Sequence, residues 1–302
     1  MTSTAGAAPV AAVDVRTADG RRRGKTGYLL LLPAFLTLLV FFVLPFYSLV
    51  ATSLYDPSGS DARGYEMTYH VQNFWTALQD FWSPLVRSLV YCLIATALCL
   101  VLGYVLAYAI AFKAGRWKYL LLVLVIAPFF TSFLVRTLSW KLLLADDGFI
   151  VNTLQALQIL GDDGRLLATP VAVIAGLTYN FLPFMVLPLF ASLDRIDHRL
   201  VEAASDLYAN PFVGFFKVTW PLSLPGVVSG IAFVFSMSVS MYVIPSLLIG
   251  DRFQTLSTLT GRSFLFMRNE QLGSTTAVIL LVLAVGVVVG SSWLARRLGG
   301  NT

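Results

Sequence analysis

Long runs of uncharged, mainly apolar residues dominate this sequence and decide what it can fold into. A helix needs about 20 apolar residues to cross a bilayer. Runs of that size cover residues 27–50, 88–112, 166–193, 218–250 and 271–295. A shorter sixth run covers residues 119–135, and Arg136 and Lys141 follow it, where they could snorkel from its outer end. The pattern therefore predicts an all-α polytopic membrane protein with six transmembrane helices. The run over 218–250 is too long for one span, so its start is expected to belong to a helix that approaches the membrane and ends near Pro221.

The distribution of charge predicts the topology. Only 12% of the residues are charged, against about 25% in a soluble domain. Basic residues cluster at 21–25 and in the short turn at 113–118, whereas acidic pairs occupy 146–147 and 162–163. By the positive-inside rule, both termini are expected in the cytoplasm. The expected organisation is a disordered basic tail over 1–27, a six-helix domain over 28–297 and a short cytoplasmic tail over 298–302.

The segment at about 194–221 lies between two spans and has its own pattern. Its first half repeats apolar residues on one helical face, with polar residues on the other. Asp197 is a plausible N-cap, and Asn210 with Pro211 is a plausible stop. The small residues Ala203 and Ala204 would let another backbone come close. A short helix of this kind between spans predicts a docking element for a cytoplasmic partner.

The same segment resembles the cytoplasmic loop of permease subunits in type I ATP-binding-cassette importers. In that family Glu-Ala-Ala is followed, at fixed spacing, by an apolar residue and Leu-Pro. The residues that match in register are Glu202, Ala203, Ala204, Asp206, Leu207, Val218 and Pro221. The chain departs at Tyr208, where the family usually has Gly, and at Trp220, where Leu is usual. The resemblance covers nearly all of residues 27–297 and implies the MetI-like permease fold.

The resemblance also implies the function and the partners. The chain would be one of two permease subunits, paired with a related and non-identical one, in a bacterial cytoplasmic membrane. An extracytoplasmic binding protein would deliver the solute, and a homodimeric ATPase would hold the ATP and Mg²⁺, so this chain itself would bind no cofactor and catalyse no reaction. The residues expected to couple it to the ATPase are Glu202, Ala203, Ala204, Asp206, Leu207, Tyr208, Pro211 and Pro221.

Within the family, the chain most resembles the polyamine (spermidine/putrescine) permeases. That closer similarity rests on residues 134–143, 148–152 and 242–250. The subgroup often has acidic residues where this chain has Met241 and Ser246, and a cationic solute would favour carboxylates on its path. Opines, sugars and amino-acid derivatives therefore remain alternative solutes.

Few polar residues lie within the spans, where such groups are costly unless they serve a purpose. The candidates for the solute pathway are Asn180, Tyr179, Tyr242 and Arg136. Asn180 should face the bundle or a pathway, and an interhelical hydrogen bond is the alternative. Arg136 could equally be an interface residue.

Prolines are expected to interrupt the helices at four positions: Pro128, Pro183, Pro188 and Pro245.

Small residues at Gly286 and Gly290 could serve either internal packing or a contact with a partner subunit. Cys92 and Cys99 fit a packing role, because two residues seven apart on one helix are too distant for a disulfide.

Other classes of function find little support in the sequence. The stretch 20–26 resembles a phosphate-binding loop but has three residues instead of four between its glycines. His70 and His198 lack the neighbours of a metal site, and no catalytic constellation or nucleic-acid-binding pattern is present. A self-sufficient secondary transporter, the main alternative, would need an acidic residue inside a span, and no span contains one. A structural membrane protein would not need the docking motif.

Overall fold

The computed structural model describes residues 23–59, 64, 66–161, 164–197, 199–200, 202, 210–249 and 253–299. Its regular structure is helical throughout these residues, apart from one isolated bridge between Tyr55 and Met67. The chain divides into two compact units, Met1–Leu49 and Val50–Thr302. Most of the predicted tails over 1–27 and 298–302 lies outside the described residues, but residues 23–27 already belong to helix α1 and residues 298–299 to helix α14.

The first unit contains helix α1 (Arg23–Leu38), the π-helical turn η1 (Leu39–Val43) and the start of α2 (Leu44–Ser53). Together they form a candidate span over Leu31–Ser53 that buries none of its apolar side chains within the chain. A helix that is apolar on all sides and leaves those sides exposed suits a lipid environment. The first predicted span is therefore present as one helix.

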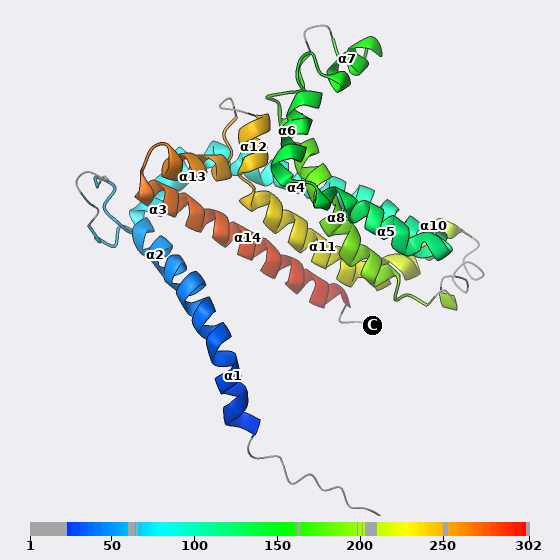
Figure 1. Cartoon of the computed structure of the whole chain (residues 1–302), viewed down its shortest axis with the longest axis horizontal. Helices are drawn as coiled ribbons and strands as arrows, with labels where there is room; N and C mark the ends of the chain where they lie inside the picture. The colour runs from blue at the N-terminus through cyan, green and yellow to red at the C-terminus, as the bar shows by residue number, and fades with distance from the viewer. Residues whose placement is uncertain are drawn as a thin grey trace, which may run out of the picture. The chain divides into compact units, whose positions relative to one another are not determined.

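Four long helices form the body of the second unit: α4 (Trp82–Tyr108), α8 (Pro170–Leu193), α11 (Trp220–Ser240) and α14 (Glu270–Gly299). Helix α8 packs against both α4 and α11, and α11 also packs against α14 (Figure 1). The core consists of fully enclosed apolar side chains from α4, α8 and α11, among them Ala95, Cys99, Met185, Leu189 and Val234. Pro183 and Pro188 lie inside an unbroken α8, so the expectation that they interrupt a helix was wrong.

The third predicted span is not a single straight helix. Helix α5 (Lys118–Ile126) passes into a 3₁₀ turn, η4 (Ala127–Phe130), and α6 (Phe133–Leu143) then leaves at 88°. Pro128 lies at the start of the 3₁₀ turn, and Thr131 is extended. Proline lacks the N–H that would continue the helix, which favours a break here. The predicted run 119–135 therefore crosses the break, and Arg136 and Lys141 belong to the separate helix α6.

The fifth predicted run also differs from the structure. Helix α10 (Pro211–Gly214), the π turn η5 (Phe215–Thr219) and α11 form one apolar helical stretch over Phe212–Ser240. No helix ends near Pro221, because proline in the first turn of a helix needs no N–H partner. The run breaks instead at Met241, which is extended, and the short helix α12 (Val243–Leu248) follows.

Short elements connect the spans. They are α3 (Gln72–Asp80), the π turn η2 (Ala109–Lys113), the 3₁₀ turn η3 (Gly115–Trp117), α7 (Phe149–Ala156) and α13 (Leu256–Leu265). Five described helices are long and apolar enough to cross a membrane, or six when the bent α5–α6 pair counts as one span. That total agrees with the six predicted spans.

Candidate coupling segment and solute pathway

The coupling segment, residues 194–221, begins with a capped helix as predicted. The carboxylate of Asp197 accepts a hydrogen bond from the backbone amide of Arg199 at 3.0 Å. Residues 199, 200 and 202 are helical, and the side chain of Glu202 is exposed. A carboxylate that accepts from the first free amides is the usual way to start a helix. Glu202 therefore lies among the helical residues that follow this cap, and its coupling role stays a prediction.

The middle of the segment lies outside the described residues. Ala203, Ala204, Asp206, Leu207 and Tyr208 belong to it, so their coupling role stays a prediction. The segment resumes at Asn210, whose side-chain oxygen accepts from the amide of Phe212 at 2.9 Å. Pro211 begins α10, so the predicted stop is also the start of the next helix.

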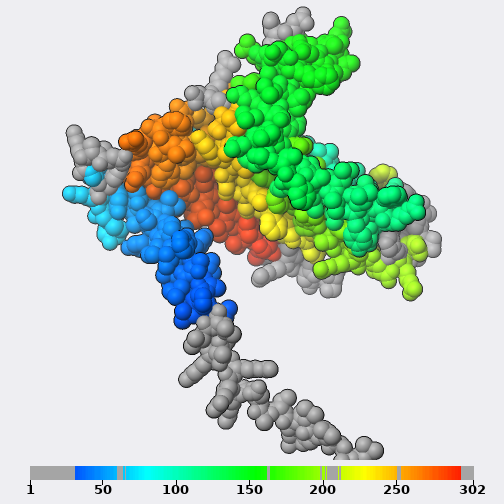
Figure 2. All heavy atoms as spheres, viewed as in Figure 1, coloured from blue at the N-terminus to red at the C-terminus, as the bar shows by residue number. Residues whose placement is uncertain are grey.

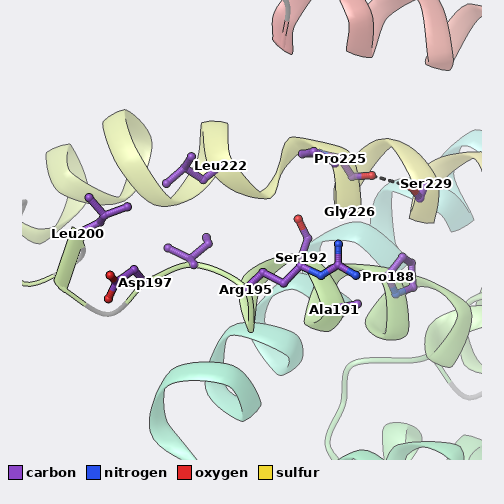
Figure 3. Close-up of a pocket in the computed structure, with 11 residues that line it drawn as sticks. Pro188, Ala191, Ser192, Arg195, Asp197, Leu200, Leu222, Pro225, Gly226 and Ser229 are labelled. Atoms are coloured by element: carbon purple, nitrogen blue, oxygen red, sulfur yellow. Dashed lines mark hydrogen bonds between the residues drawn. The ribbon is translucent and has the colours of Figure 1, made fainter. Parts of the chain in front are cut away.

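An apolar pocket of about 560 Å³ lies beside this segment, between the end of α8 and the start of α11. Figure 3 shows side chains from both helices around it, including Ser192 and Arg195 from the α8 side and Leu222 from α11. Asp197 and Leu200, from the coupling segment itself, complete one end. A movement of the segment would therefore change the shape of this pocket directly.

Asn180 faces the interior of the bundle, as predicted. The residue is 2% exposed, and its amide nitrogen donates to the carbonyl of Gly176 in its own helix at 2.8 Å. Its side-chain oxygen has no hydrogen-bond partner among the described residues. The amide nitrogen therefore bonds within its own helix and does not make the interhelical hydrogen bond that was the alternative prediction. A buried acceptor without a partner is energetically unfavourable, and a contact of this oxygen with the solute stays a prediction.

The other pathway candidates do not gather around Asn180. Tyr179 is 38% exposed, and its ring packs on Trp140 of α6 at 5.3 Å between centroids. The guanidinium of Arg136 lies 4.9 Å from the ring of Phe129. Since Tyr179 is exposed and Asn180 enclosed, the two lie on different sides of α8.

The last candidate, Tyr242, lies at the break after α11. Its ring covers Gly261 so closely that a Cβ atom there would come within 2.4 Å of a ring carbon. Tyr242 is thus a packing contact between this break and α13.

The sequence interpretation missed a line of serines on the exposed side of α11. Ser229 and Ser240 are exposed, and Ser236 is half-buried on the same stripe as the exposed Phe233. The hydroxyls of Ser229 and Ser240 donate to carbonyls of their own helix, whereas the Ser236 hydroxyl has no partner among the described residues. The spacing of 229, 236 and 240 at seven and four residues is the signal that could have revealed this face.

The serine stripe borders a groove of about 660 Å³ between α11 and α14. Figure 2 shows the two helices side by side, in yellow and red. Ser291 and Ser292 line the groove from α14. A cleft with several hydroxyls along two apolar helices is an unusual surface to present to lipid alone.

Gly286 and Gly290 lie on α14 just before Ser291 and have no tight packing around them. No atom of the described residues would come within 4 Å of a Cβ atom at either position. The prediction that these glycines serve tight internal packing is therefore wrong, and a contact with a partner subunit stays a prediction. Cys92 and Cys99 are free and buried, which agrees with their predicted packing role.

Comparison with known proteins identifies the architecture. The model of the family described as "Binding-protein-dependent transport system inner membrane component" matches residues 99–299. The chain is 36% identical over 247 residues to the spermidine/putrescine transport system permease protein PotB of Haemophilus influenzae, covering 81% of this chain and 86% of the relative. It is 33% identical over 262 residues to PotB of Escherichia coli, covering 86% and 94%.

A solved structure shares the fold. It is a chain of a bacterial alginate ABC transporter in complex with an alginate pentasaccharide-bound periplasmic protein, with a TM-score of 0.73, 17% identity, and coverage of 91% of this chain and 95% of that one. The family match spans two thirds of the residues and agrees with the helical architecture and its apolar spans. The chain therefore belongs to the family of binding-protein-dependent transport system inner membrane components.

Proposed function

We propose that this chain is the permease subunit of an ATP-binding-cassette importer for polyamines such as spermidine or putrescine. The observation that supports the solute is the similarity to polyamine permeases at 33–36% identity across most of both chains. The alginate system shares the fold at 17% identity and gives no support for a polysaccharide solute.

The proposed assembly has four kinds of component. This permease pairs with a second, related permease, a binding protein delivers the polyamine outside, and two copies of an ATPase bind ATP and Mg²⁺ in the cytoplasm. The proposed contact with the ATPase is the segment around Glu202, whose exposed carboxylate follows the helix cap at Asp197. The orientation follows the positive-inside distribution of charge, with both termini in the cytoplasm.

The pathway is proposed to lie along the serine stripe of α11, facing the second permease. The exposed hydroxyls of Ser229 and Ser240 offer a moving solute weak, exchangeable hydrogen bonds without fixing it. Asn180 is a separate interior acceptor that a rearrangement of α8 would bring into use. The groove beside α14 gives the second subunit a surface on which to close the pathway.

Coupling follows from the packing of α8 and α11. Closure of the ATPase pair on ATP would displace the coupling segment, which joins the end of α8 to the start of α11. Because these helices are in close contact, a displacement at one end moves them as rigid bodies instead of bending them. Alternating exposure of the stripe to the two sides of the membrane would then accompany each ATP cycle.

The test is reconstitution of the complex purified through this chain from its own host. Binding protein loaded with spermidine should stimulate ATP hydrolysis and drive uptake of labelled spermidine into proteoliposomes. Glu202→Ala should lower the stimulated ATPase rate about tenfold, as loss of an allosteric contact does. Glu66→Ala, which removes an exposed carboxylate between the first two spans, is the matched control. A chain that purifies without an ATPase, or that transports spermidine without ATP, would contradict the proposal.

A further inference from the structure

Five aromatic side chains meet where the coupling segment enters α11, and we refer to them as the aromatic joint. They come from α4 with η2 and from η5 with α11: Tyr104, Tyr108, Phe112, Phe215 and Trp220. The ring of Tyr104 lies 5.5 Å from that of Phe215 and 5.3 Å from that of Trp220 between centroids, and Phe215 also contacts Tyr108 and Trp220. The joint thus connects the last turns of the coupling segment, where it enters α11, to a different span, α4.

A hydrogen-bonded node lies beside the rings. The hydroxyls of Tyr104 and Ser223 lie 2.9 Å apart, and both residues are buried. The Ser223 hydroxyl also donates to the carbonyl of Trp220 at 2.9 Å, while the Ser223 carbonyl accepts from Ser192 of α8 at 3.5 Å. Ser223 therefore links α4, α8 and α11 at one point.

The position of the joint is unusual in two ways. It lies between two π turns, η2 at the end of α4 and η5 at the start of α11. Such turns are rare and occur often where function requires a local change of helix geometry. Trp220, in addition, departs from the Leu that the resemblance to importer permeases implies at this position, and its ring lies beside that of Tyr104.

We propose that Tyr104 and Trp220 are positioning residues that transmit movement of the coupling segment to α4. Aromatic rings contact one another in preferred edge and tilted geometries, and they have few rotatable bonds. A displacement of Trp220 is therefore passed to Tyr104 as a displacement instead of being absorbed by a change of rotamer. The Tyr104–Ser223 hydrogen bond fixes the register of the two helices during that movement. This inference rests on the proposed function.

The variant Tyr104→Phe distinguishes a role of Tyr104 in transmitting movement from a role in packing alone. Tyr104→Phe keeps the ring and its contacts, and the Ser223 hydroxyl retains the Trp220 carbonyl as its acceptor. The folded state should therefore lose little stability. If the hydroxyl maintains the register between α4 and α11, the variant should instead lose coupling while its assembly stays intact.

The experiment measures spermidine taken up per ATP hydrolysed in proteoliposomes, together with the thermal stability of the purified complex. Tyr104→Phe and Trp220→Leu are expected to lower the uptake per ATP by about fivefold or more. Trp220→Phe, which retains a ring against Tyr104, should stay near the wild type. Tyr91→Phe removes a hydroxyl from a buried tyrosine elsewhere on α4 and serves as the matched control.

The outcomes separate this inference from the proposed function. Wild-type ratios in both Tyr104→Phe and Trp220→Leu would overturn the role of the joint while leaving the importer intact. A ratio that falls only in step with thermal stability, or that falls equally in Tyr91→Phe, would also overturn it. Absence of ATP-coupled uptake in the wild type would instead contradict the proposed function itself.

Discussion

The backbone of Gly226 lies directly against the carbonyl oxygen of Pro188, where a Cβ atom would come within 2.6 Å. The Cβ of Ser192 would be equally close. Pro188 and Ser192 lie on the same face of α8. The helices α8 and α11 therefore approach each other almost backbone to backbone at this point. Small residues permit this kind of contact between membrane helices. The two helices that flank the coupling segment are thereby held together just beyond it.

Gly226→Ala should consequently be among the most damaging single-methyl changes in the chain. The added carbon would meet backbone atoms of Pro188, which cannot move aside as a flexible side chain could, and overpacking of this kind costs about 1–3 kcal/mol. The expected result is a lower thermal stability of the purified chain in detergent and weaker uptake. Gly286→Ala is the control, because its Cβ would meet no described atom within 4 Å. Equal effects of the two substitutions would contradict the close approach.

An ion pair connects the start of α5 with the end of α8. The Lys118 ammonium lies 2.8 Å from a carboxylate oxygen of Asp194, the residue that follows the last turn of α8. Both side chains are partly exposed, so the pair should add little to stability. Its value would lie in orienting the start of the coupling segment.

Lys118→Glu should therefore reduce ATP-coupled uptake more than it reduces thermal stability, because it places two like charges at this junction. The double variant Lys118→Glu with Asp194→Lys restores an opposite pair and should recover most of the uptake. Uptake and ATPase rates in proteoliposomes at low and high salt would check this, because screening weakens the exposed pair. Lack of recovery in the double variant would show that the orientation does not depend on this pair.

Asn180 provides a third prediction. Because its side-chain oxygen is buried without a described partner, Asn180→Leu should leave stability unchanged or raise it. If the oxygen meets the solute during transport, the same variant should lower the uptake rate. Asn73→Leu is a contrasting control, since Asn73 donates to the carbonyls of Ser53 and Tyr55 at 3.1 and 2.8 Å, and the substitution would remove both hydrogen bonds. If Asn180→Leu lowered the thermal stability of the protein, this would contradict the finding that the side-chain oxygen of Asn180 is unpaired.

The spans and the capped start of the coupling segment could be predicted because they depend on local properties. Uninterrupted apolar length identifies a span whatever its neighbours are, and Asp197 caps a helix through an amide only two residues away. The inward direction of Asn180 was also predictable, because a polar side chain in an apolar helix avoids lipid.

The breaks could not be predicted in the same way. Pro128 lies at a bend of 88°, whereas Pro183 and Pro188 lie in an unbroken helix, although all three interrupt apolar runs. A proline leaves a backbone carbonyl of the preceding turn without its N–H partner. Neighbouring helices decide whether this is tolerated, and a single sequence does not show which helices are neighbours. The serine stripe of α11 escaped notice for a related reason: apolar residues surround the helix, so its exposed face becomes visible only once α4, α8 and α14 are in place.

The solute itself can be tested at Ser246. This residue of α12 is half-buried, and its hydroxyl donates to the carbonyl of Val243 at 2.9 Å. The resemblance to polyamine permeases implies an acidic residue at this position, so the present chain would have one carboxylate fewer than that resemblance implies. If the solute is a polyamine, the chain recognises it with weaker, uncharged groups at this point.

Ser246→Asp should then lower the KM for spermidine uptake about tenfold, equivalent to about 1.4 kcal/mol of added affinity. The reason is that a carboxylate forms a charge-assisted hydrogen bond with an ammonium group, which is stronger than the bond a serine hydroxyl can make. Ser246→Asn has nearly the same shape without the charge and should leave the KM near the wild type. Labelled spermidine uptake in proteoliposomes at several concentrations gives both values. A higher KM in Ser246→Asp, together with an unchanged KM in Ser246→Asn, would contradict contact between this position and the cation, whereas absence of spermidine uptake by the wild type would contradict the polyamine assignment itself.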